Sequence, residues 1–102
     1  LAVEAGPPPT ACDALQTLAT RPINFAVLRT RVAGGLVVSE AEVRAAQRFA
    51  FARLRLVVEP GGAAALAAAF AGKVSLDGRT AIVLSGGNVD PAAFSRVIDS
   101  RN

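Results

Sequence analysis

The sequence has no histidine, tryptophan, tyrosine or methionine, and only one cysteine and one lysine among its 102 residues. Without histidine and with a single cysteine, it offers no spacing typical of a zinc site. It also lacks the interleaved aromatic and basic side chains that bind nucleic acid. Lys and Arg outnumber Asp and Glu by 11 to 8, but these charges are spread along the chain and form no basic block. Nucleic-acid binding is therefore disfavoured.

Long apolar runs are missing as well. The longest covers residues 63–71, whereas a membrane-spanning helix needs about 20 residues. No membrane span is expected, and the amino end shows no secretory signal pattern. Cys12 is the only cysteine, so an internal disulfide cannot form and a reducing compartment is indicated. We predict a cytoplasmic protein.

Small apolar residues are abundant instead. Apolar residues make up 52% of the chain, and 22 of them are alanine, which favours helices and close packing of backbones. Larger apolar residues are few, so a core of this size is marginal. The Pro-rich segment, residues 1–10, is expected to connect residues 11–102 to something before them. The chain is thus interpreted as a C-terminal piece of a longer protein, with a trimmed small domain as the alternative.

The strongest helix signal follows Ser39. Ser39 and Glu42 form a capping box, in which each side chain bonds the other residue's amide. Over residues 40–54, apolar side chains recur at helical spacing and predict a buried stripe of Val43, Ala46, Ala50 and Leu54. Another face of this helix carries basic side chains that could bind an anion, although a solvated face is the favoured interpretation: Arg44, Arg48 and Arg55.

Three more helices are expected. Pro22 suits a helix start and predicts a short helix over about 23–31. The alanine-rich run 63–71 predicts a helix that ends at Gly72. Asp90 and Pro91, a cap followed by a first-turn proline, begin the last helix. Its predicted buried stripe is Phe94, Val97 and Ile98.

Short β-branched runs alternate with these helices. Residues 36–38 and 56–58 are consistent with buried strands, and 80–84 has the pattern of a strand buried on both faces. Alternation of strands and helices over 36–98 predicts an α/β layer with a mainly parallel sheet.

Two glycine-rich segments follow predicted strands, Glu59-Pro60-Gly61-Gly62 and Ser85-Gly86-Gly87-Asn88. Ligands of open α/β sheets bind outside the carboxyl ends of strands. Glycines let a flat or anionic ligand approach the backbone, although a tight turn is the favoured interpretation of either segment taken alone. Ser85 has no histidine to activate it as a nucleophile. Lys73 follows a helix end, where it suits the dipole, and shows no sign of a desolvated pocket.

Together the segments 58–63 and 83–90 resemble the C-terminal third of the threonine/serine dehydratases. These are fold-type-II pyridoxal 5'-phosphate enzymes with a tryptophan-synthase-β-like large domain, and serine racemase is a relative. Residues 37–43 are similar to the family's strand and capping box, and residues 12–16 stand where the family has a short cofactor-side loop. The resemblance runs from about Thr10 onward.

The resemblance implies a role for six residues at the cofactor. A serine in contact with the pyridine nitrogen leaves that nitrogen neutral and the electron sink weaker than a carboxylate would. Glycines after it would let the ring come close, and a glutamate would organise the loop. Alanine stands where the family usually has a ring-contacting glycine. The implied cofactor-binding residues are Ser85, Gly86, Gly87, Asn88, Glu59 and Ala14; Asn88 matches a position that contacts a nucleotide effector in the serine racemase branch.

The family's Schiff-base lysine, substrate-carboxylate loop, phosphate cradle and metal ligands lie in its earlier two thirds. The resemblance therefore implies no catalytic residue and no metal ligand in this chain, which is expected to be inactive alone. The intact enzyme would be a homo-oligomeric lyase that converts a hydroxy amino acid to a 2-oxo acid and ammonia. Alternatives are serine racemase, a hydroxyectoine-pathway dehydratase, threonine synthase, or a non-catalytic α/β remnant that binds a partner.

Overall fold

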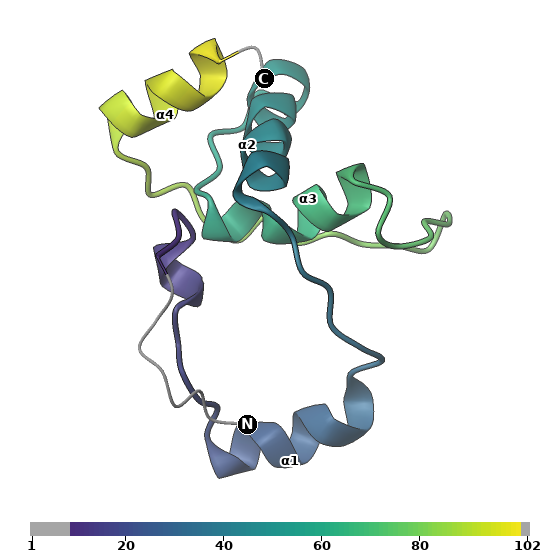
Figure 1. Ribbon diagram of the computed structural model, residues 1–102. Coiled ribbons are helices and arrows are strands. Elements are labelled where there is room, and N and C mark those ends of the chain that lie inside the picture. Colours follow the sequence, from purple (N-terminus) through teal and green to yellow (C-terminus); the bar gives the residue numbers. More distant parts are fainter. Residues whose placement is uncertain (1–8, 101–102) are drawn as a thin grey trace.

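The computed structural model describes residues 9–100, so most of the predicted Pro-rich segment lies outside it. Every regular element in this range is helical (Figure 1). In chain order they are η1 (Asp13–Leu15), α1 (Pro22–Arg31), α2 (Glu40–Phe49), η2 (Ala50–Leu54), η3 (Gly61–Ala63), α3 (Ala64–Phe70) and α4 (Pro91–Asp99). All four predicted helices are therefore confirmed.

The capping box at the start of α2 is present. Ser39 Oγ accepts a hydrogen bond from the Glu42 amide at 3.2 Å, and the Glu42 carboxylate accepts one from the Ser39 amide at 2.7 Å. Lys73 Nζ donates to the same carboxylate at 2.9 Å and to the Val37 carbonyl at 2.6 Å. The lysine therefore ties the end of α3 to the start of α2.

Small residues form the centre of the packed part. Ala46, Ala50, Ala63 and Ala67 are fully buried, and Val43 and Val58 are 2% exposed. Because alanine adds little bulk, α2 lies close against η3 and α3, as the alanine-rich composition predicts (Figure 1). Beyond the helices, Cys12 is buried in the same cluster, with Val38, Leu66 and Leu84 packed at its edge.

The last helix, α4, packs against α2. The Asp90 carboxylate caps it by accepting from the Ala93 amide at 2.8 Å, and Phe94 is buried with its ring edge-on to Phe51 at 5.6 Å. Arg48 donates to Ser100 Oγ at 2.9 Å and to the Val97 carbonyl at 3.4 Å.

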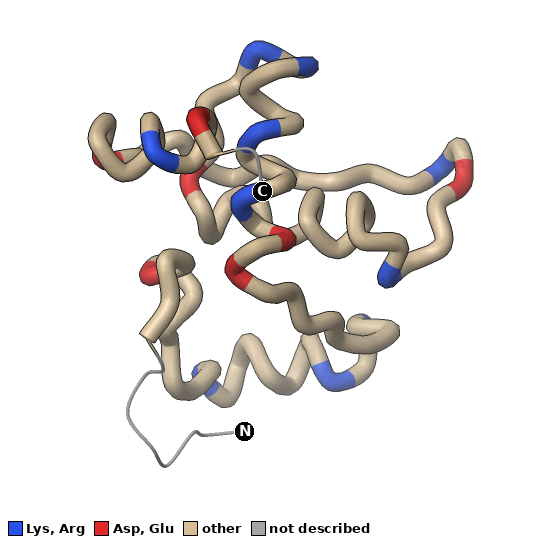
Figure 2. Tube along the Cα trace, turned by 45° about the horizontal axis from the view of Figure 1, so that its top comes forward, with Lys and Arg blue, Asp and Glu red and all other residues tan. Residues whose placement is uncertain are grey.

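This pairing separates Arg48 from the other two arginines of the proposed basic face. Arg44 and Arg55 are both exposed, and Arg55 ends the preceding helical turn with a left-handed φ of 60°. Lys and Arg lie on α1, α2, η2, α4 and the loops rather than on one face (Figure 2). The favoured solvated face therefore holds for Arg44 and Arg55, and Arg48 is a structural link.

The predicted sheet is not formed within residues 9–100. The runs 36–38, 56–58 and 80–84 are extended but belong to no β-strand. Val83 is 72% exposed, so the prediction of a strand buried on both faces is wrong for this chain. A strand requires a neighbouring strand to satisfy its amides and carbonyls, and these three runs form no ladder with one another.

The stripe on the long helix also differs from its prediction at one end. Val43, Ala46 and Ala50 are buried, but Leu54 is 45% exposed. The helix widens into the π-helical turn η2 over its last five residues. This change of pitch rotates Leu54 off the buried side.

Candidate functional site

The two glycine-rich segments lie side by side. The Glu59 amide donates to the Gly86 carbonyl at 2.9 Å. The Glu59 carboxylate in turn accepts from the Asn88 amide at 3.0 Å. One glutamate thus holds both ends of the Gly86–Asn88 segment, although Glu59 and Gly86 lie 27 positions apart in the sequence.

The two glycines of this segment leave no room for a side chain beside their protein neighbours. A Cβ on Gly86 would lie 2.6 Å from Glu59 Oε1, and one on Gly87 would lie 2.8 Å from the Val57 carbonyl oxygen. Both distances are far below van der Waals contact. The backbone contact therefore demands a glycine at position 87, independently of the approach of a ligand, whereas a side chain at position 86 would displace the Glu59 carboxylate.

Gly62 and Ala14 complete the cluster. A Cβ on Gly62 would lie 2.9 Å from the Gly86 amide nitrogen, and one on Gly61 would lie 3.5 Å from Ala14 Cβ. The turn η1, which carries Ala14, therefore packs on the first glycine-rich segment. The structure brings Ala14, Glu59, Gly86, Gly87 and Asn88 into one neighbourhood.

Ser85 begins the second glycine-rich segment and is exposed. Its hydroxyl makes no hydrogen bond to any residue in the described range 9–100. Ser85 directly precedes Gly86, so its position depends on the contacts that hold the turn. Lys73 lies elsewhere, paired with Glu42.

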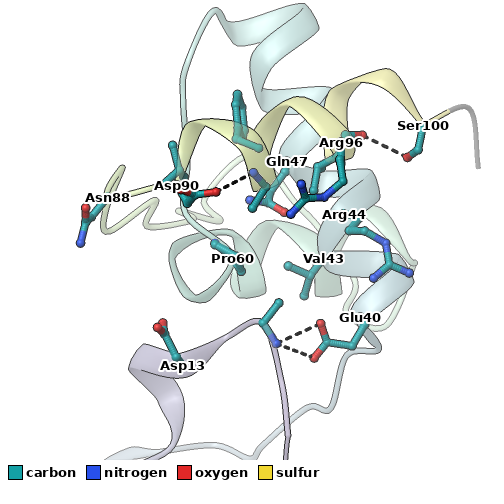
Figure 3. A pocket seen from close by; sticks show the side chains of 15 residues that line it. Asp13, Glu40, Val43, Arg44, Gln47, Pro60, Asn88, Asp90, Arg96 and Ser100 are labelled. Atoms are coloured by element: carbon teal, nitrogen blue, oxygen red, sulfur yellow. Dashed lines mark hydrogen bonds between the residues drawn. The ribbon is translucent and has the colours of Figure 1, made fainter.

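A cavity of about 540 Å³ lies between η1, α2 and α4 (Figure 3). Of the predicted site residues, only Asn88 lines it. Charges of both signs lie around its wall, from Asp13, Glu40, Arg44, Asp90 and Arg96. Glu40 accepts from the Ala11 amide and from the Thr10 hydroxyl, which joins the segment before η1 to α2.

Sequence reasoning missed Gln47, the buried polar side chain of this region. Gln47 is 2% exposed, and its Nε2 donates to the Val58 carbonyl at 2.9 Å. The signal was available, because Gln47 lies four residues after Val43 and three before Ala50, on the predicted buried stripe. Because its side chain is polar, Gln47 is absent from the residues predicted to be buried.

Two side chains have pKa values that differ from their ordinary ones, Cys12 and Glu42. Burial raises the pKa of the Cys12 thiol above its ordinary value, so the thiol stays protonated. The hydrogen bond from the Ser39 amide, followed by that from Lys73, lowers the pKa of Glu42.

Within residues 9–100, no three side chains of the metal-binding types gather into a group. No helix in that range has the length and apolar character needed to cross a membrane.

Comparison with known proteins identifies relatives. The chain is 38% identical over 92 residues to serine racemase of Schizosaccharomyces pombe, covering 89% of this chain and 28% of that protein. It is 34% identical over 100 residues to L-threo-3-hydroxyaspartate ammonia-lyase of Saccharomyces cerevisiae, covering 97% and 31%. No family model matches the chain.

A solved structure is also similar. The crystal structure of a threonine deaminase from T.th. matches with a TM-score of 0.79 and 44% identity, over 88% of this chain and 32% of that one. The chain thus spans about a third of the length of the proteins it matches. The resemblance to the threonine/serine dehydratases and serine racemase is confirmed, and the chain is related to this fold-type-II pyridoxal phosphate family.

Proposed function

We propose that the chain is the C-terminal part of a pyridoxal-phosphate-dependent ammonia-lyase that removes water from a β-hydroxy amino acid and yields a 2-oxo acid and ammonia. The observation that carries this proposal is the contact of the two motif segments through Glu59. The relatives are named as a hydroxyaspartate ammonia-lyase, a threonine deaminase and a serine racemase. Each of those names refers to an amino acid with a hydroxyl on the β-carbon.

The residues of the turn fit the pyridine side of the cofactor. The Ser85 hydroxyl is exposed and has no partner within residues 9–100, so it is free to bond a ring nitrogen. The following glycines hold the backbone near Glu59, which keeps the turn in one conformation. In this proposal Ser85 meets the nitrogen, Gly86, Gly87 and Asn88 form the loop, Glu59 organises it, and Ala14 flanks the ring.

When bound, pyridoxal phosphate supplies an electron sink for the charge left by removal of the α-proton. Ser85 determines the strength of that sink, because a neutral hydroxyl does not force a proton onto the ring nitrogen. Elimination of a β-hydroxyl needs only a moderate sink. This chain therefore contributes orientation and electronic tuning, while the covalent attachment is supplied by another part of the enzyme.

Other features of the intact enzyme follow from the same proposal. The extended runs 36–38, 56–58 and 80–84 become strands of the parallel sheet when the remaining strands of the large domain pair with them. The enzyme is a cytoplasmic homo-oligomer, and its upstream residues provide the lysine and the phosphate-binding loop.

Serine racemase activity is the second candidate. It is supported by the 38% identity to the Schizosaccharomyces pombe protein. The two activities differ in product, since racemisation returns the amino acid with inverted configuration and elimination releases ammonia. Chiral analysis of the amino acid alongside ammonia release separates them.

The test uses the full-length enzyme with pyridoxal phosphate, and it assays serine, threonine and 3-hydroxyaspartate. We expect the Ser85→Asp variant to slow ammonia release about tenfold, which is the effect of about 1.4 kcal/mol on a barrier, and to increase transamination. Ser75→Asp is the matched control, because Ser75 is an exposed serine outside the cluster.

Unchanged product ratios in Ser85→Asp would refute the role of Ser85 at the ring nitrogen. A full-length protein that takes up no pyridoxal phosphate would refute the proposed function as a whole and leave the non-catalytic interpretation.

A further inference from the structure

Gln47 makes the first of a series of hydrogen bonds that leads to the glycine-rich segment Ser85–Asn88. Its Nε2 donates to the Val58 carbonyl at 2.9 Å. That carbonyl shares one peptide group with the Glu59 amide, which donates to the Gly86 carbonyl at 2.9 Å. Because the peptide group is planar, fixing its oxygen also fixes the direction of its N–H. Hydrogen bonds in such a chain polarise and strengthen one another.

A second connection from Glu59 to the Ser85–Asn88 segment is made by the Glu59 side chain. Once the backbone of Glu59 is oriented, its carboxylate reaches the Asn88 amide at 3.0 Å. Gly86 and Asn88 are thus both held by one residue, whose backbone depends on Gln47. Ser85 is joined directly to Gly86 and is carried with it.

Because both partners are buried, loss of the hydrogen bond between Gln47 and the Val58 carbonyl is destabilising. Gln47 is 2% exposed, and a buried amide or carbonyl without a partner is strongly disfavoured. Val58 is likewise 2% exposed, so water has little access to its carbonyl as a substitute partner. An apolar side chain at position 47 could fill the space, but it would leave the Val58 carbonyl unpaired.

We infer that Gln47 is a positioning residue: from α2 it orients the Val58–Glu59 peptide and thereby holds the Ser85–Asn88 segment in place. The effect of Gln47 on cofactor binding rests on the function proposed above. The effect of Gln47 on the Ser85–Asn88 segment is independent of that function and can be measured in this chain without a cofactor.

The first experiment is amide hydrogen exchange by NMR on this chain and on Gln47→Met. Methionine has a similar length and no donor. We expect the Glu59 and Asn88 amides to exchange about tenfold faster in the variant, as the loss of one buried hydrogen bond implies. The Val43 amide, bonded to the Ser39 carbonyl within α2, serves as the internal reference and should keep its rate.

The matched control is Arg48→Met, which also removes hydrogen bonds donated by a side chain of α2, here to the Val97 carbonyl of α4 and to the Ser100 hydroxyl. It should leave the Glu59 and Asn88 amides within about twofold of their original rates. Equal acceleration by Gln47→Met and Arg48→Met would mean that Gln47 contributes only general stability, and would overturn the inference.

A measurement on the unsubstituted chain covers the case in which Gln47→Met does not fold. The Glu59 and Asn88 amides lie in irregular segments, yet the link requires them to be protected from exchange as well as the Val43 amide is. Exchange of either at the rate of a free loop amide would overturn the inference without any variant.

The consequence at the cofactor is tested in the full-length enzyme. Gln47→Met should weaken pyridoxal phosphate affinity about tenfold, and Arg48→Met should change it less than about twofold. Equal affinity in Gln47→Met and the unsubstituted enzyme would overturn the link to the cofactor. Failure of the unsubstituted enzyme to bind the cofactor would instead overturn the proposed function, and the exchange data would still decide the positioning role.

Discussion

Two helices of equal length behave differently in this molecule. Helices α1 and α2 have ten residues each, but α1 has no buried residue, whereas α2 buries Val43, Ala46 and Gln47. The start of α2 is closed by a capping box, and the N-cap of α1, Arg21, makes no side-chain cap. Local signals were therefore sufficient to form both helices, and a partner surface was available to only one.

The difference lies in what surrounds each helix. α2 is packed against α3 and α4, while α1 lies apart from them at the other end of the molecule (Figure 1). Its apolar side chains stay uncovered, with Ile23 77%, Val27 58% and Phe25 43% exposed. The radius of gyration, 14.8 Å, exceeds the roughly 13 Å of a compact chain of this size. The comparison teaches that apolar content alone does not bury a helix.

Matched phenylalanine substitutions should break this comparison most strongly. Phe94 is 8% exposed and Phe25 is 43% exposed. We expect Phe94→Ala to lower the free energy of unfolding by about 3 kcal/mol, since it empties a buried site. Phe25→Ala should lower it by less than about 1 kcal/mol. Urea unfolding followed by circular dichroism measures both, and similar losses would mean that α1 is packed after all.

Glycine substitutions provide the next comparison. A Cβ on Gly62 would lie 2.9 Å from the Gly86 amide nitrogen, a backbone atom, whereas a Cβ on Gly34, between α1 and α2, would meet nothing within 4 Å. We expect Gly62→Ala to cost about 1–3 kcal/mol through overpacking. Gly34→Ala should be neutral or stabilising by about 0.5 kcal/mol, because it restricts the unfolded chain. A tolerated Gly62→Ala in urea unfolding would contradict the close contact of the two glycine-rich segments.

Exchanging the caps should reduce the contrast between the helices. Ser39→Ala removes the cap of α2 and should cost about 1 kcal/mol. Arg21→Ser should add a cap to α1, because the N-cap backbone is already extended and the Asn24 amide lies at the N3 position. Helicity from Cα chemical shifts measures both effects. An α1 whose helicity is unchanged by Arg21→Ser would show that the missing cap is not what limits it.

The sequence predicted the helices well because their signals are local. Pro22, the Ser39–Glu42 box and Asp90-Pro91 each act within one turn, and each begins a helix as expected. The strand prediction for 80–84 failed in this chain because a strand depends on neighbours far away in sequence. The family resemblance brought Glu59 and the Ser85–Asn88 segment together as candidates. Helical spacing places Gln47 on the buried stripe, but its partner, the Val58 carbonyl, depends on a three-dimensional contact that no local pattern reveals.

The smallest expected effect concerns pH and distinguishes the two helix starts once more. Bonds from the Ser39 amide and Lys73 lower the pKa of Glu42 below its ordinary 4.5, whereas the first turn of α1 has no acidic residue. Between the folded and unfolded pKa values, the unfolded chain binds more protons, so the stability contributed by Glu42 rises with pH. It is fully present above about pH 4.5 and is lost as pH falls through the folded value. Urea unfolding at a series of acidic pH values should therefore show that the free energy of unfolding rises less steeply with pH in Glu42→Gln. An unaltered pH dependence would mean that the Glu42 carboxylate does not keep its capping hydrogen bonds in solution.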